Sequence, residues 1–328
     1  MRAKGINYDT GFFPDGGDTR PRFDPELARR ELRVIAEELH CSAVRISGGD
    51  PARLTAAAEH AAAAGLEIWY SPFPCELAAA DMLPYFADCA ERAESLRAGG
   101  AEVVLVTGCE LSAFAPGFLP GATTSERIEG MSAFTMEDWS NLGPVLEKLS
   151  AFLAESTAAV RERFHGKVTY AAAPWEFIDW TPFDIVSVDA YRASYNTDTY
   201  SDEIRGLFQH GKPVAVTEFG TCAYQGAADR GGMAWAVTDW SGGTPRVSPE
   251  LVRDESEQVR YLNDLLAVYE AEGVDAAFWF TFAGYARPHD PEPGRDLDLG
   301  SYGVVKMLDE VQWEPKEVFH AMAAAYRE

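Results

Sequence analysis

Several features that would identify other classes of protein are scarce or missing in this sequence. Its five cysteines are an odd number without CxxC spacing, so neither a disulfide framework nor a cysteine zinc site is indicated. The six histidines form no HxH or HxxxH pair, which argues against a histidine zinc centre. Charged residues interrupt every apolar run before it reaches the roughly 18 residues of a membrane helix. We therefore expect no metal ion and no membrane partner.

Positive charge is also scarce. Lysine and arginine number 28 against 52 aspartates and glutamates, which gives a net charge of -24. A chain this acidic repels phosphate backbones, so we expect no nucleic-acid partner and consider an uncharged or cationic small molecule a better match. The first residues lack the apolar segment of a signal peptide, which predicts a cytoplasmic protein with reduced thiols.

What the sequence does contain is a regular alternation of strand-like and helix-like apolar patterns. Eight runs have the strand-like pattern: Lys4–Tyr8, Ser42–Ser47, Glu67–Ser71, Glu102–Thr107, Val168–Ala173, Asp184–Asp189, Pro213–Thr217 and Asp275–Thr281. Seven stretches have the helical period: Pro25–His40, Pro51–Ala64, Ala80–Ala98, Gly143–Phe164, Ser201–Gln209, Glu255–Glu272 and Pro315–Tyr326. Eight such units predict an α/β fold, a (β/α)8 TIM barrel with one domain over residues 1–328. An open doubly wound sheet is disfavoured because no glycine-rich phosphate turn follows the first run.

Long connections follow the first, fourth, seventh and eighth strands. They cover Asp9–Phe23, Leu111–Leu142, Phe219–Asp254 and Phe282–Glu314. All four leave the carboxyl ends of strands, which is the face where barrel enzymes place their sites. This asymmetry predicts a binding site on that face.

Two glutamates, Glu110 and Glu218, stand just past the fourth and seventh strand-like runs. Carboxylates on two different strand ends can flank one glycosidic bond, as glycoside hydrolysis requires. In a retaining mechanism the two carboxyl groups lie about 5–5.5 Å apart, and one attacks while the other transfers a proton. We predict that these two glutamates are the catalytic pair.

Further polar and aromatic residues are expected at the other strand ends, where aromatic rings can stack on a sugar and polar groups can bind its hydroxyls. The predicted substrate-binding residues are Asn7, Arg45, Tyr70, Trp175, Asp189, Tyr191 and Trp279. Arg45 and Tyr191 would also suit a nucleophile that must stay ionised. Three alternatives remain open at this point: Arg45 and Asp189 as partners in structural contacts, and Trp279 as a core residue.

This layout resembles the clan A glycoside hydrolases, and the second half is similar to glycoside hydrolase family 113, a group known for β-mannanases. The matching segments are Gly108–Leu111, Thr169–Ala172, Asp184–Tyr191, Gly211–Gly220 and the region of Trp279. The resemblance implies that Glu110 is the acid/base and Glu218 the nucleophile, with Tyr191 and Arg45 as helpers. Cys109 stands where most clan A families carry an asparagine that binds the sugar 2-hydroxyl, and a thiol makes that hydrogen bond poorly.

The sequence therefore predicts a retaining glycoside hydrolase that acts on a β-linked glycoside, either a small molecule or an oligosaccharide, without metal or organic cofactor. Two alternatives follow from Cys109 and from the aromatic residues of the long connections. The same carboxylates would serve non-glycosidic acid/base chemistry on a specialised metabolite, or the barrel would bind sugars without cleaving them. Sugar identity, linkage and oligomeric state are not indicated by the sequence.

Overall fold

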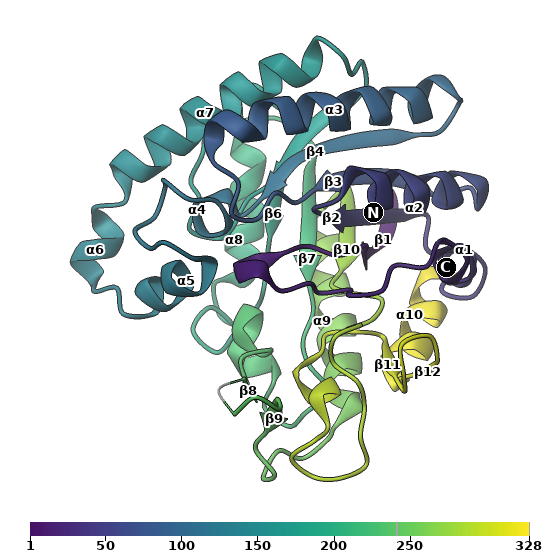
Figure 1. Cartoon of the computed structure of the whole chain (residues 1–328). Helices are drawn as coiled ribbons and strands as arrows, with labels where there is room; N and C mark the ends of the chain where they lie inside the picture. The colour runs from purple at the N-terminus through teal and green to yellow at the C-terminus, as the bar shows by residue number, and fades with distance from the viewer. Residues whose placement is uncertain (241, 328) are drawn as a thin grey trace.

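Eight parallel strands form the inner wall of the molecule, hydrogen-bonded in the order β5-β4-β3-β2-β1-β10-β7-β6 (Figure 1). The computed structural model describes residues 1–240 and 242–327. The strands are β1 (Ala3–Asp9), β2 (Ala43–Gly48), β3 (Glu67–Pro72), β4 (Val103–Cys109), β5 (Lys167–Ala171), β6 (Val186–Asp189), β7 (Val214–Phe219) and β10 (Ala276–Trp279). A parallel bridge between Ala172 and Val188 joins β5 to β6 and closes the ring. The predicted TIM barrel is confirmed.

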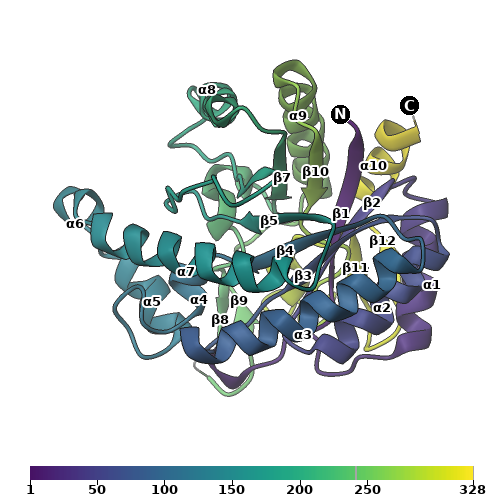
Figure 2. The ribbon, with the colours of Figure 1, turned by 90° about the horizontal axis from the view of Figure 1, so that it is seen from above.

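Seven helices surround the barrel, as the sequence predicted: α1 (Pro25–Glu37), α2 (Pro51–Ala63), α3 (Ala79–Ala98), α7 (Gly143–Arg161), α8 (Tyr200–Gly206), α9 (Glu255–Glu272) and α10 (Glu317–Arg327). Asp24 and Asp50 cap α1 and α2 by accepting hydrogen bonds from the first backbone N–H groups, and a proline follows each cap. Figure 2 shows α3 and α7 side by side along one flank. Within residues 1–240 and 242–327, no helix combines the length and apolarity needed to span a membrane.

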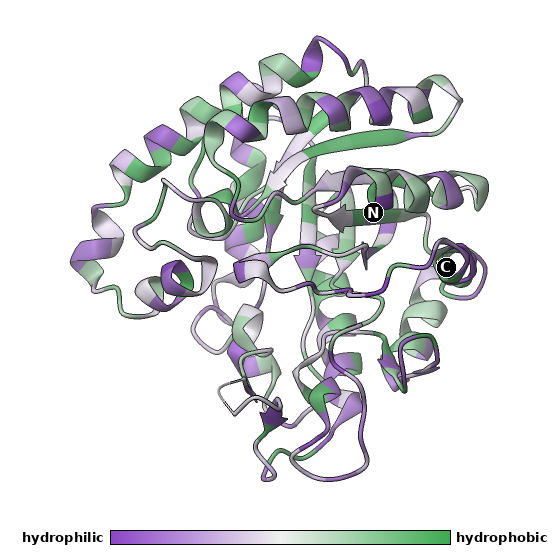
Figure 3. Cartoon of the chain, viewed as in Figure 1, coloured by the Kyte–Doolittle hydropathy of each residue, from purple (hydrophilic) through white to green (hydrophobic). Residues whose placement is uncertain are grey.

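The strands bury two different apolar layers because successive side chains point to opposite faces. Trp69 and Phe278 fill the barrel interior, with ring centroids 4.8 Å apart. Their neighbours Tyr70 and Trp279 point the other way, into the layer between strands and helices. Apolar residues accordingly run along the strands in Figure 3, whereas hydrophobic and hydrophilic residues alternate along the surrounding helices.

The long connections contain short elements that the sequence patterns did not predict. After β4 come α4 (Leu111–Phe114), α5 (Thr124–Ser132) and α6 (Met136–Ser140), and after β1 comes η1 (Pro14–Gly16). The connections after β7 and β10 hold η3 (Ala228–Met233), β8 (Thr238–Asp239), β9 (Arg246–Val247), η4 (Leu297–Gly300), β11 (Val305–Met307) and β12 (Trp313–Pro315). A further short element, η2 (Leu207–His210), follows α8 directly, where the sequence predicted helix up to Gln209. Elements this short show no measurable apolar period, so local capping decides them. Thr135 and Asp138, for example, form a complete capping box at the start of α6.

Buried ion pairs tie the connections after β7 and β10 to the start of α10. The Asp298 side chain is 1% exposed and lies 2.9 Å from Arg253 Nη2 and 2.8 Å from Lys316 Nζ. Arg253 also contacts Asp296 at 2.7 Å. These contacts hold two loops of the site face in place, because a buried charge without its partner is strongly unfavourable.

Replacing Asp298 by asparagine should destabilise the fold by about 3–5 kcal/mol, since Lys316 would remain buried without a counter-charge. Urea unfolding measures the change. Glu310→Gln is the matched control, because the Arg22–Glu310 pair is exposed and should contribute less than about 1 kcal/mol. Equal, small losses in both variants would show that the Asp298 cluster does not hold the loops.

Candidate active site

Glu218 is the centre of a group of predicted residues at the carboxyl ends of the strands. The other members are Asn7, Arg45, Asp189 and Tyr191. Arg45 Nη1 on β2 donates a hydrogen bond to Glu218 Oε1 over 2.6 Å. Tyr191 Oη, just after β6, donates to the other oxygen, Oε2, over 2.9 Å. Both oxygens of Glu218 therefore accept a hydrogen bond from a strong donor, which stabilises the carboxylate and fixes its orientation.

The Arg45 guanidinium is completely buried and is held by neighbouring strands. Its Nη1 donates to Asn7 Oδ1 on β1 over 3.1 Å, and its Nε donates to Ser71 Oγ on β3 over 3.1 Å. Asn7 is itself oriented by donating from Nδ2 to the Thr217 carbonyl over 2.9 Å. Asn7 is 1% exposed, so it supports Arg45 rather than reaching a substrate.

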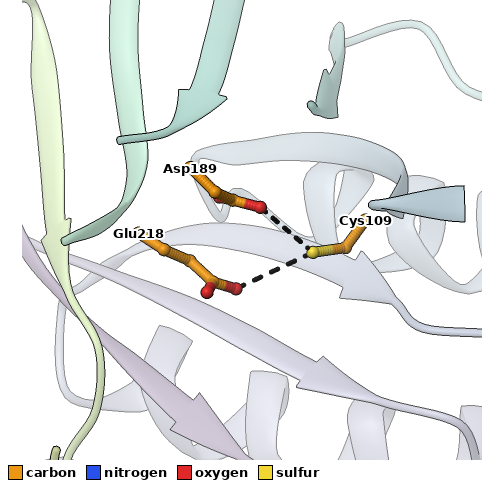
Figure 4. A group of neighbouring side chains, drawn as sticks. All are labelled: Cys109, Asp189 and Glu218. Carbon is orange, nitrogen blue, oxygen red and sulfur yellow. Dashed lines mark hydrogen bonds between the residues drawn. The ribbon is translucent and has the colours of Figure 1, made fainter. Parts of the chain in front are cut away.

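The Cys109 thiol lies between the carboxyl groups of Asp189 and Glu218. Cys109 Sγ donates to Asp189 Oδ2 over 3.3 Å and lies 3.7 Å from Glu218 Oε1 (Figure 4). Burial, reinforced by the charge of Glu218 and opposed by Arg45, raises the pKa of Asp189 from 3.8 to about 8. Burial also raises the pKa of the Cys109 thiol well above its usual value. At neutral pH the thiol is therefore neutral, and Asp189 is mostly protonated.

Cys109, Asp189 and Glu218 are also the residues that could hold a metal ion, since their donor atoms lie within 4.8 Å of one another. Coordination would require a thiolate and ionised carboxylates. The raised pKa values of Cys109 and Asp189 oppose that ionisation, and the Arg45 cation already contacts Glu218. The arrangement therefore fits a hydrogen-bonded cluster better than a metal site, and the absence of a metal stays a prediction.

Glu110 follows β4 in a left-handed backbone conformation, with φ 45° and ψ 42°. Few residues other than glycine adopt this conformation, and such strain is concentrated at functional sites. Burial raises the pKa of Glu110 well above its ordinary value, and the negative charges of Asp189, Glu218 and Glu176 add to the shift. Glu110 is thus a carboxyl group whose protonated form is favoured by burial and by the nearby charge of Glu218.

A buried carboxylate holds the turn that carries Glu110. Glu176 accepts hydrogen bonds from the Ser112 backbone N–H over 2.9 Å and from Tyr170 Oη over 2.8 Å. Tyr170 Oη in turn accepts from the Leu111 N–H over 2.7 Å. Trp175, which is partly exposed, donates from Nε1 to Ser112 Oγ over 3.1 Å and lies on the Glu110 side of the site.

Two predicted substrate contacts are not brought to the site. Tyr70 is fully buried against α2, where its hydroxyl lies 3.1 Å from Thr55 Oγ1. Trp279 is fully buried on the helix side of β10 and donates from Nε1 to the Tyr302 carbonyl over 2.9 Å. The alternation of side chains along a strand turns both residues away from the barrel mouth. The alternative interpretation of Trp279 as a core residue is therefore the right one.

The aromatic residue that does reach the site after β10 is Phe280, which the sequence analysis missed. It is partly exposed and packs in the same cluster as Tyr191, with its ring centroid 5.8 Å from that of Tyr302. Counting one further residue along the period-2 strand pattern would have found it.

The raised pKa of Asp189 predicts a loss of stability with increasing pH. The folded chain keeps a proton on Asp189 that the unfolded chain releases above pH 4, so the free energy of unfolding falls between about pH 4 and 8. This group contributes up to about 1.4 kcal/mol per pH unit in that window.

Asp189→Asn cannot titrate, so urea unfolding across this pH range should give a flatter profile than in the wild type. Asp198→Asn, at an exposed position, should leave the profile unchanged. Parallel profiles for wild type and Asp189→Asn would mean that Asp189 is ionised in the folded chain.

No protein-family model matches the chain, and neither does any curated protein sequence. Solved structures do match. A GH113 β-1,4-mannanase aligns with a TM-score of 0.64 and 16% identity over 100% of both chains. The GH113 β-mannanase AaManA from Alicyclobacillus acidocaldarius aligns with a TM-score of 0.61 and 17% identity, over 99% of this chain and 97% of that one. A family 1 β-glucosidase from Thermotoga maritima aligns with a TM-score of 0.57 and 12% identity, over 99% of this chain and 97% of that one. The chain has the barrel fold of clan A glycoside hydrolases over its full length, as its sequence motifs indicated.

Proposed function

We propose that the chain is a retaining glycoside hydrolase that acts on a β-linked glycoside, with Glu218 as the nucleophile and Glu110 as the acid/base. The observation that carries this proposal is the contrast between the two glutamates. Glu218 is anchored by a buried arginine and a tyrosine hydroxyl, whereas Glu110 forms no ion pair within residues 1–240 and 242–327 and has a raised pKa. A retaining mechanism needs this difference between an ionised nucleophile and a protonated acid.

The proposed reaction has two steps. Glu218 Oε attacks the anomeric carbon while Glu110 gives its proton to the departing glycosidic oxygen, and a glycosyl ester forms on Glu218. A water molecule then attacks the same carbon, Glu110 takes the proton from that water, and the ester bond to Glu218 breaks. Arg45 and Tyr191 would stabilise the Glu218 carboxylate as it leaves.

A barrel that binds sugars without cleaving them is the second candidate, and Cys109 favours it. The thiol contacts Glu218 Oε1 at 3.7 Å and its hydrogen bond is directed at Asp189. It is therefore not available to orient a sugar hydroxyl beside the nucleophile. Calorimetric binding of a sugar that the protein never hydrolyses would support this candidate over the hydrolase.

The exchange of either glutamate for glutamine should sharply reduce turnover of aryl β-glycosides that the wild type cleaves. We expect losses of about 10²- to 10⁴-fold, the usual contribution of a positioned acid or base and a lower bound for a nucleophile. Glu110→Gln should retain more activity on substrates with an activated phenol, which leaves without a proton. Glu310→Gln, at an exposed position, is the control. Full activity in either variant would contradict the assignment.

The raised pKa of Glu110 also sets the pH profile. The rate of the first step should fall as pH rises through that pKa, because an ionised Glu110 has no proton to give. Glu110→Gln should lose this alkaline limb on aryl glycosides with activated leaving groups. A limb that persists unchanged in the variant would assign it to a different group.

A further inference from the structure

Arg287, on the site face, is a partly buried arginine without a carboxylate partner among the described residues. Seventeen arginines of the chain form ion pairs within the described residues, and the five that do not are Arg30, Arg230, Arg246, Arg287 and Arg327. Four of these are exposed, as unpaired cations usually are. Arg287 alone among them is partly buried. A half-buried cation without an anion is unfavourable, so its position needs an explanation.

The surroundings of Arg287 leave most of its donors free. Its Nη1 donates to Thr238 Oγ1 over 2.7 Å, which is its one side-chain hydrogen bond among residues 1–240 and 242–327. A guanidinium carries five N–H donors in a planar fork that matches a carboxylate or sulfate. Burial lowers the pKa of Arg287, and the charge of Asp298 is among the smaller effects that oppose this shift. An incoming anion would therefore meet a cation that is not yet neutralised.

Two tryptophans flank this guanidinium. Arg287 Cζ lies 5.5 Å from the Trp240 ring centroid and 6.0 Å from that of Trp235. Trp240 is 53% exposed, which is unusual for so large an apolar ring. Gly300 permits the packing, because a Cβ there would lie 2.6 Å from Arg287 Nη1. A cation next to an open aromatic face can bind a sugar that carries an acidic group.

A series of contacts leads from the nucleophile to Trp235, which lies beside Arg287. Tyr191, which donates to Glu218, packs against Tyr302 with ring centroids 5.9 Å apart. Tyr302 Oη accepts from the Ala234 N–H over 3.1 Å, and Trp235 is the next residue. The short β8–β9 ribbon and the segment after β10 lie together at the bottom of Figure 1, beyond the carboxyl ends of β7 and β10.

We propose that Arg287, Trp235 and Trp240 form a subsite for an acidic sugar, with an oxyanion on the guanidinium and the sugar C–H face on Trp240. The inference rests on the proposed function, because it adds the substrate class to the same site. It departs from the expectation of an uncharged or cationic ligand that the net charge of -24 suggested. Exposed charges are screened over about 8–10 Å, so the local cation outweighs distant carboxylates.

Binding to a non-cleaving Glu218→Gln chain tests the subsite without relying on turnover. The acidic probes are the methyl β-glycosides of glucuronic, galacturonic and mannuronic acid and the 6-sulfates of the corresponding neutral sugars. The neutral parents are the methyl β-glycosides of those sugars without the sulfate. Calorimetry measures the binding of each probe. At least one acidic probe should bind on the order of tenfold more tightly than its neutral parent. Adding Arg287→Gln should abolish that difference and leave the neutral parent unchanged, and Arg287→Lys should retain part of it. A carboxylate or sulfate preference identifies the oxyanion.

Arg246→Gln is the matched control, since Arg246 is an unpaired but exposed arginine on the connection after β7. Trp240→Ala should weaken acidic and neutral probes alike, because it removes the stacking face. The proposal is overturned if no acidic probe binds more tightly than its parent, or if Arg287→Gln weakens both equally. If acidic probes bind in a way that depends on Arg287 but the wild type cleaves no glycoside, the subsite proposal stands and the hydrolase proposal is refuted. Cleavage of neutral glycosides without any effect of Arg287 would do the reverse.

Discussion

The buried Arg45 guanidinium is the interaction on which the site depends. Its hydrogen bonds reach from β2 to its neighbours β1 and β3 and across the barrel mouth to Glu218 on β7, so one side chain links four strands. A fully buried cation requires a buried anion, and breaking such a pair by removing one partner destabilises a protein by about 3–5 kcal/mol. The fold and the proposed nucleophile are therefore coupled. Glu218 is therefore required at this position as the partner of Arg45, which an apolar residue of similar size could not replace.

One cation cannot neutralise three carboxyl groups. Glu218 contacts Arg45 at 2.6 Å, whereas Asp189 Oδ1 lies 3.9 Å away. Burial raises the pKa of both Asp189 and Glu110, and the negative charge of Glu218 adds to each shift. Direct contact with Arg45 thus separates Glu218 from two buried carboxyl groups whose pKa values are raised. This division is the physical basis of the proposed nucleophile and acid/base roles.

Much of the barrel was predictable because long helices and strands show a clear period of apolar residues in the sequence. Every predicted boundary of these elements lies within three residues of the observed one. The position of Glu110, Glu218, Arg45 and Asp189 at one end of the barrel was predictable because parallel strands bring their carboxyl ends together. Tyr70 and Trp279 were wrong because a strand end alone does not say which face a side chain takes. Arg287 was beyond prediction, since the lack of an ion-pair partner is a property of the folded chain.

The central claim is that Glu218 attacks the anomeric carbon. The most direct measurement is to incubate the protein with 2-deoxy-2-fluoro-β-glycosides bearing an activated leaving group and to map the modified peptide by mass spectrometry. The account predicts one glycosyl group per chain on Glu218, with loss of activity at the same rate. A label on Asp189, Cys109 or Glu110, or no label from glycosides whose parents the protein hydrolyses, would contradict it.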